Sequence, residues 1–111
     1  MFVNLTPHEV VLYREDGKSL VLASKGIARV DSTPGVCREV VDGIPIYEAP
    51  VMGEVYGLPA PIAGTVYIVS GVVAGACKGR ADVVYPGTGP KDGAVRDAQG
   101  RVIGVTRLID A

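Results

Sequence analysis

The sequence predicts a mainly β (α+β) fold, a single small antiparallel sheet or barrel-like domain with one or two short helices. Short apolar runs rich in Val and Ile recur along the chain, and these side chains favour pleated sheet. Tight-turn signals separate the runs, above all the Asp-Gly pairs at 16–17 and 42–43. Because 111 residues suffice for one core but not two, we expect residues 1–111 to form a single domain.

The N-terminal half is expected to consist of hairpins. Asp16-Gly17 and Asp42-Gly43 lie between apolar runs, so each is predicted to be the tight turn of one hairpin. Residues 31–35 contain Ser, Thr, Pro and Gly and are predicted to form a turn. Strands are therefore expected over residues 2–5, 10–13, 19–23, 26–30, 36–41 and 44–47.

The C-terminal half is predicted to hold the central strand and the helix. Residues 49–63 are rich in proline and should run over the surface, with one short extended piece at 54–56. Residues 65–69 are the most β-branched segment and are expected to be the central strand. A short helix over 72–78 is predicted to be capped by Ser70. Further strands are expected over 82–85 and 105–109, with a last hairpin over 94–103 that turns at 97–100.

Composition excludes several classes of partner. The formal net charge is −1, whereas a protein that binds long nucleic acid usually shows a basic excess. No apolar run approaches membrane-spanning length, and the first residues lack the pattern of a secretion signal. We therefore expect a cytoplasmic protein, acting in the cell that makes it, with no membrane and no long nucleic acid as partner.

Cysteine and histidine give little sign of a reactive site. Cys37 and Cys77 lack the spacing of a metal site, and buried free thiols are the expectation in a reducing compartment. His8, the only histidine, lies in a turn where its imidazole is expected to bond to backbone. Sequence signatures such as GxSxG, HExxH and the Walker loop are absent. We expect no metal, no cofactor, no catalytic residues and no enzymatic activity.

A glycine- and proline-rich loop at residues 85–93 is the most informative segment. It lies between two apolar runs, and it contains Pro86, Thr88, Gly89 and Lys91. Glycine lets a bound group approach main-chain N–H donors, while Lys91 and Thr88 supply a charge and a hydroxyl, so the loop could cradle a phosphate. It could also be a plain connector whose glycines only turn the chain, and the loop by itself favours this second interpretation.

Arginines in apolar strand contexts are the other candidates. Arg29 follows Gly-Ile-Ala, Arg107 follows Gly-Val-Thr, and Arg96 stands beside a valine. Such side chains either point off the polar face of a sheet or make forked contacts to phosphate oxygens. Because Arg29 and Arg107 come from opposite ends of the chain, they can share a groove only through tertiary or dimer packing.

The residues also resemble a family. The Asn-Leu-Thr-Pro-His segment at residues 4–8 is similar to the start of small proteins carried by phages and prophages. On this basis the chain resembles the first-described family of anti-Thoeris sponges. These phage proteins sequester cyclised ADP-ribose signals made by bacterial TIR-domain sensors, and some also bind cyclic oligonucleotides of the CBASS system. Other similar segments occur in the same order over nearly the whole chain, at residues 26–30, 53–59, 64–70, 80–84 and 95–104.

The resemblance implies a small antiparallel sheet with short helices, assembled as dimers or a trimer of dimers, with ligand pockets between chains. It implies a small phosphorylated nucleotide-like ligand that is held without catalysis. Arg29 and Arg107 match the phosphate-binding arginines, and the loop from Pro86 to Lys91, with Thr88 and Gly89, would supply the polar wall near the base and ribose. The chain departs from the family pattern in having few aromatic residues for stacking, and glycines where polar loop residues are expected.

Two other functions remain open from the sequence. One is a small structural or assembly-related phage protein that acts through protein–protein contacts. The other is a small hydrolase of the same signals. Under each of them we expect a homo-oligomer, because a valine-rich strand set has more apolar surface than one short helix can cover.

Overall fold

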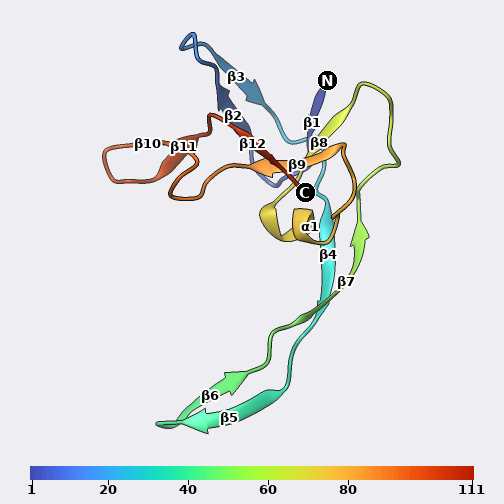
Figure 1. The fold of residues 1–111 in the computed structure, drawn as a ribbon, viewed down its shortest axis with the longest axis vertical. Coiled ribbons are helices and arrows are strands. Elements are labelled where there is room, and N and C mark those ends of the chain that lie inside the picture. Colours follow the sequence, from blue (N-terminus) through green and yellow to red (C-terminus); the bar gives the residue numbers. More distant parts are fainter.

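The computed structural model describes residues 1–111 and confirms a mainly β fold with twelve strands and one short helix (Figure 1). A small body carries a long β-ribbon that projects away from it, and two shorter hairpins leave the body on the other side (Figure 1). The strands form five sheets rather than one. The largest has four strands, and the other four are two-stranded antiparallel pairs.

The four-stranded sheet lies at the centre of the body and has the order β1-β8-β9-β12. Strand β8 (Val66–Ile68) is flanked by β1 (Phe2–Asn4) and β9 (Val83–Pro86), which confirms the predicted central strand. Both of these pairings are parallel, and only β12 (Leu108–Asp110) joins β9 in antiparallel fashion. The mixed sheet was not expected from the sequence, because parallel neighbours are joined by long crossovers that leave no local turn signal.

Side chains alternate across β8 and divide the core into two clusters. Tyr67 and Val69 point to one face, where they pack with Val83. Helix α1 (Gly71–Gly75) covers this face, and the Ser70 hydroxyl accepts a hydrogen bond from the Val73 amide at 3.4 Å, as the predicted cap requires. The helix ends at residue 75 rather than 78, consistent with the low helix propensity of glycine.

The opposite face of the sheet is covered by the hairpin of β2 (Val10–Tyr13) and β3 (Ser19–Leu22). Ile68 and Val84 from the sheet meet Val10 there, and Leu12 and Leu22 pack around them. Gly17 has φ +83°, which confirms the predicted tight turn.

A second hairpin is joined edge-on to β2 and does not enter the core. It consists of β10 (Val95–Arg96) and β11 (Val102–Gly104), and it turns through residues 97–100 as predicted. Val105 follows it and exchanges main-chain hydrogen bonds with β2, through Tyr13 N to Val105 O at 2.8 Å and Val105 N to Val11 O at 2.9 Å.

The projecting ribbon, residues 29–56, is called the arm. Its inner part pairs β4 (Arg29–Thr33) with β7 (Val51–Tyr56), and its outer part pairs β5 (Cys37–Val41) with β6 (Ile44–Tyr47). Asp42 and Gly43 both have positive φ, which confirms the second predicted hairpin turn.

Two predictions about the arm were wrong. Residues 31–33 belong to a strand rather than a turn. The extended piece predicted at 54–56 is present, but its strand begins at Val51, so residues 51–53 belong to the longest strand rather than to surface coil. Pro34 and Pro50 lie just beyond the paired Thr33 and Val51. Proline has no N–H to donate, so here it interrupts the ribbon between its inner and outer parts instead of ending it.

The buried side chain of Asn4 connects the central sheet to the β2–β3 hairpin. Its amide donates to the carbonyls of His8 and Leu22 at 2.8 and 2.9 Å. Its oxygen accepts from the Thr6 amide and hydroxyl at 2.9 and 2.7 Å. The imidazole of His8 forms no hydrogen bond, contrary to expectation; its main-chain carbonyl is the group that is used.

Replacing Asn4 by Ala is expected to lower the free energy of unfolding by about 2–4 kcal/mol, because the buried Thr6 amide and the part-buried carbonyls of Leu22 and His8 each lose a hydrogen-bond partner. Urea denaturation followed by circular dichroism measures the change. Gln99→Ala, which removes an exposed amide, is the control and should shift stability by less than about 0.5 kcal/mol. An equal effect of the two substitutions would contradict the role given to Asn4.

Candidate functional site

The largest cavity of the chain has a volume of about 600 Å³ and lies beside the β2–β3 hairpin. Its walls come from both ends of the chain, since β1 and the segment entering β12 contribute to it. The apolar wall is formed by four side chains, and the remainder is aromatic or polar. The lining residues are Phe2, Leu12, Leu20 and Leu108, with Tyr13, Arg14, Glu15, Thr106 and Arg107.

Local pairing explains why these side chains share one cavity. Leu12 and Leu20 are direct partners in the β2–β3 ladder, so their side chains lie on the same face. Tyr13 lies against Gly104, where a β-carbon would overlap the Tyr13 ring. The absence of a side chain at residue 104 thus lets β11 approach the hairpin closely and holds this wall in place.

Two arginines, Arg14 and Arg107, give the cavity its positive charge. Both side chains are exposed, and neither forms an ion pair or a hydrogen bond to another residue of the chain. Glu15 is the one carboxylate among the lining residues. The site therefore presents two unpartnered guanidinium groups beside apolar and aromatic surface.

The predicted loop is adjacent to Arg107. The Gly87 amide donates to the Arg107 carbonyl at 3.0 Å. A β-carbon at Gly87 would lie 2.8 Å from Arg107 Cγ, so glycine is needed for this approach. The structure thus brings the loop and Arg107 together, as the sequence-based hypothesis supposed.

The loop uses some of its own donors. The Gly89 amide donates to Asp92 Oδ2 at 2.8 Å, and the Asp92 amide donates to the Gly89 carbonyl at 3.0 Å. Together with the Gly87 bond, these contacts close the loop on itself and on Arg107. For these amides the connector interpretation of the loop fits the geometry better than the phosphate cradle.

The other candidate residues lie apart from the largest cavity. Pro86 and Thr88 line a smaller cavity of about 170 Å³ beside β2 and β11, and Lys91 is exposed and lines neither. Arg29 is the first residue of β4, pairs with Tyr56 and lines no cavity of the single chain. A pocket that contains both Arg29 and Arg107 is not formed within one chain, and its formation between chains stays a prediction.

Sequence reasoning missed Arg14, Phe2 and Tyr13. Arg14 belongs to the turn that was read only as a hairpin signal, and Phe2 was read only as part of a strand. A register assignment for residues 10–22 could have shown that Tyr13, Arg14 and Leu20 gather at one end of the hairpin. Their approach to residues 106–108 depends on tertiary packing and has no local signal.

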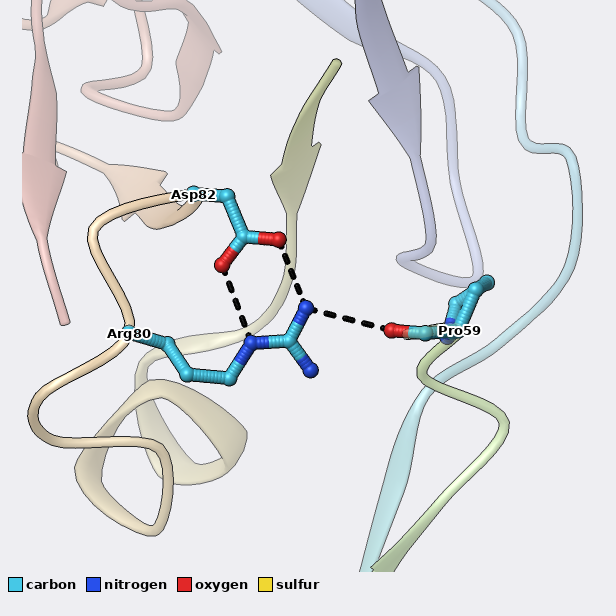
Figure 2. A network of polar contacts seen from close by, with 3 residues as sticks. All are labelled: Pro59, Arg80 and Asp82. Carbon is cyan, nitrogen blue, oxygen red and sulfur yellow. Dashed lines mark hydrogen bonds and ion pairs between the residues drawn. The ribbon is translucent and has the colours of Figure 1, made fainter. Parts of the chain in front are cut away.

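A second polar cluster is already satisfied within the fold (Figure 2). Arg80 donates to both oxygens of Asp82, at 2.9 and 2.6 Å, and also to the carbonyl of Pro59 at 3.1 Å. This fork ties the segment after the arm to the entry of β9. The hydrogen bonds from Arg80 lower the pKa of the Asp82 carboxyl. Since all these groups are partnered, the cluster is a structural clasp rather than a binding site.

The cysteine thiols and the acidic side chains form no further reactive or metal-binding site. Cys37 and Cys77 are both free. Cys77 is buried, as predicted, and burial raises the pKa of its thiol. Cys37 is exposed on β5, so the prediction of a buried thiol is wrong for this residue. No group of three or more His, Cys, Asp or Glu side chains is placed to hold a metal ion.

Comparisons with protein-family models, with curated proteins and with solved structures each find no match for this chain. No helix of the structure combines the length and the apolar character needed to cross a membrane.

The Arg80–Asp82 fork predicts a pH-dependent contribution to stability. Because the pKa of Asp82 is lowered in the folded state, the contribution is present above the unfolded-state value of about 3.9 and is lost as pH falls through the folded value. Chemical denaturation from pH 7 to pH 2 should therefore show a difference between wild type and Asp82→Asn that shrinks toward low pH. Asp110→Asn, which removes an exposed carboxylate without a partner, serves as control. A difference independent of pH would assign the effect to something other than the ion pair.

Proposed function

We propose that this protein binds a small phosphorylated nucleotide-like ligand and sequesters it without chemical change. The observation that carries the proposal is the largest cavity, where Arg14 and Arg107 stand without partners beside aromatic and aliphatic side chains. A volume of about 600 Å³ lies within the range of small-molecule sites.

Each part of such a ligand has a matching surface. Guanidinium groups make forked, charge-assisted hydrogen bonds to phosphate oxygens. Phe2 and Tyr13 supply aromatic rings on which a base can stack, although the chain as a whole has few aromatic residues. Leu12 and Leu20 supply apolar contact.

The cavity is better suited to binding than to hydrolysis. No histidine or cysteine lines it, and Glu15 has no second carboxylate beside it to share acid and base roles. The Thr106 hydroxyl donates within the chain, toward the carbonyls of Asp92 and Gly93 at 3.3 and 3.1 Å, and no base lies next to it.

The resemblance carried by residues 4–8 narrows the ligand class to cyclised ADP-ribose or a cyclic oligonucleotide. In this proposal the protein is a phage-encoded counter-defence factor that removes an immune signal from the cytoplasm of the infected cell. A structural or assembly role for a phage protein is the second candidate, and the exposed apolar side chains of the arm are the observation that favours it.

The first experiment asks what the protein carries. Purified protein is heated, and the released small molecules are identified by mass spectrometry. An intact cyclic nucleotide supports sequestration, and a linear product would favour the hydrolase. If no nucleotide is released and none of the cyclic signals binds in titration, the structural role is favoured instead.

Replacing Arg107 by Ala should remove one charge-assisted contact and weaken binding by about 1.5–3 kcal/mol, roughly ten- to a hundredfold. Arg14→Ala should act similarly, because its guanidinium lies on the same cavity. Isothermal titration with cyclised ADP-ribose and cyclic oligonucleotides measures the change. Arg101→Ala, outside the cavity, is the matched control and should bind as the wild type does. Undiminished binding by the Arg107 variant would remove this residue from the site.

A further inference from the structure

We infer that two copies of this chain associate by docking the arm of each on the body of the other. The inference concerns residues 29–56, not the ligand cavity, and it does not rest on the proposed function.

The arm exposes apolar side chains that the fold leaves uncovered. Ile44 is 65% exposed and Val51 is 68% exposed, on β6 and β7 respectively. Every residue of β5 is exposed. Isolated apolar residues are normal on a protein surface, but here Val41 and Ile44 are direct cross-strand partners, so exposed apolar side chains gather on one projecting element and mark an interaction site. The set comprises Val36, Val40, Val41, Ile44, Tyr47 and Val51.

The excess surface matches the size of a stable interface. The chain exposes 7,497 Å², about 1,700 Å² more than the roughly 5,800 Å² expected for a folded monomer of 11.5 kDa. Its radius of gyration is 16.7 Å, against about 13 Å for a compact domain of this length. Burying this excess in both chains of a dimer would cover about 3,400 Å² in total, within the range of about 2,000–5,000 Å² found for obligate homodimers. Docking the arm on a second copy would bring the exposed area into the normal range.

An isolated two-stranded ribbon is marginal in water, so a surface that covers the arm would stabilise it. The root of the arm is fixed, because Val30 and Val55 pack against the core cluster beneath α1. Gly57 ends the arm at φ +76°, where a β-carbon would lie 2.6 Å from the Ile27 carbonyl. Figure 1 shows the arm leading away from the body, so the body of the same chain leaves it uncovered.

The net charges favour docking of the arm on the body of the second copy rather than on its arm. The arm holds two arginines and five carboxylates, a net charge of −3, whereas the rest of the chain holds nine basic and seven acidic residues, a net charge of +2. Two arms in contact would repel each other, and an arm on a body is attracted. A second copy supplies this complementary surface, and reciprocal docking gives a closed twofold dimer.

The first test is the mass in solution. Sedimentation equilibrium of the full chain at 1–100 µM should give twice the 11.5 kDa chain mass. A shortened variant replaces residues 34–50 by Asn-Gly, which joins the paired Thr33 and Val51 by a two-residue turn. This variant keeps every core residue and should be monomeric. A monomeric full chain, including one that binds only some other protein, overturns the inference, and so does a dimeric shortened variant with a native circular-dichroism spectrum.

Point variants keep the arm but change its surface. Val40→Lys combined with Ile44→Lys places charges on exposed positions of β5 and β6 and should weaken the dimer at least tenfold. Val40→Ile combined with Ile44→Val changes the same positions but keeps them apolar, and should leave the dimer intact. Equal dissociation constants for the two variants would show that the arm surface is not the contact.

The exposed Cys37 on β5 reports the orientation of the arm, since Cys77 is buried. A benzophenone attached to Cys37 should crosslink to residues outside 29–56 of the other chain when illuminated. Raising NaCl from 50 to 500 mM should weaken an arm-to-body dimer, because salt screens the attraction. Efficient Cys37–Cys37 disulfide formation in a dimer that salt strengthens would instead show arm-to-arm contact and overturn the docking proposed here.

Discussion

The side-chain amide of Asn4 is the contact on which most of the body depends. It uses both of its N–H donors and accepts two hydrogen bonds, so its hydrogen-bonding capacity is filled by groups of Thr6, His8 and Leu22. Aspartate at this position would lack the donors, and an apolar side chain would lack both functions. The amide thereby fixes the edge of the central sheet against the hairpin that lines the cavity, with the Lys25 amide bonding to the Asn4 carbonyl on the same edge.

The small buried fraction of the chain explains why the remaining features of the molecule lie at its surface. Only 16 of 111 residues are buried, and the apolar core among them consists of two small clusters of eight and three residues, on either face of β8 and β9. The Arg80–Asp82 fork and the Ser70 cap secure the segments that border these clusters. Outside these clusters lie a positively charged cavity and a negatively charged apolar arm. The cavity suits an anionic partner, and the arm suits a partner with a positively charged surface.

Local features of the fold could be predicted from the sequence, and non-local ones could not. Asp16-Gly17 and Asp42-Gly43 define their hairpins because positive φ is a property of the turn residues themselves. The parallel pairing of β1 with β8 and the ribbon of β4 with β7 join segments whose register no nearby turn fixes.

The candidate site shows the same division. Arg107 and its neighbouring loop were found through their unusual local sequence, and Gly87 does place them together. Arg14 carries no such signal, because its turn resembles any other charged hairpin turn. Arg29 was selected for a similar local context to Arg107, but its strand leads into the arm and away from the cavity.

The parallel pairing of β1 with β8 also sets an order of events during synthesis. Phe2 is synthesised well before its partner Val66, which follows only after the arm is complete. The outer hairpin of the arm, β5 with β6, pairs residues close in sequence and forms quickly. The β4–β7 ribbon and the β1–β8 pair must each close a longer loop before their contacts form. Strand β1 therefore has no β8 to pair with until the residues between them, including the whole arm, have been synthesised.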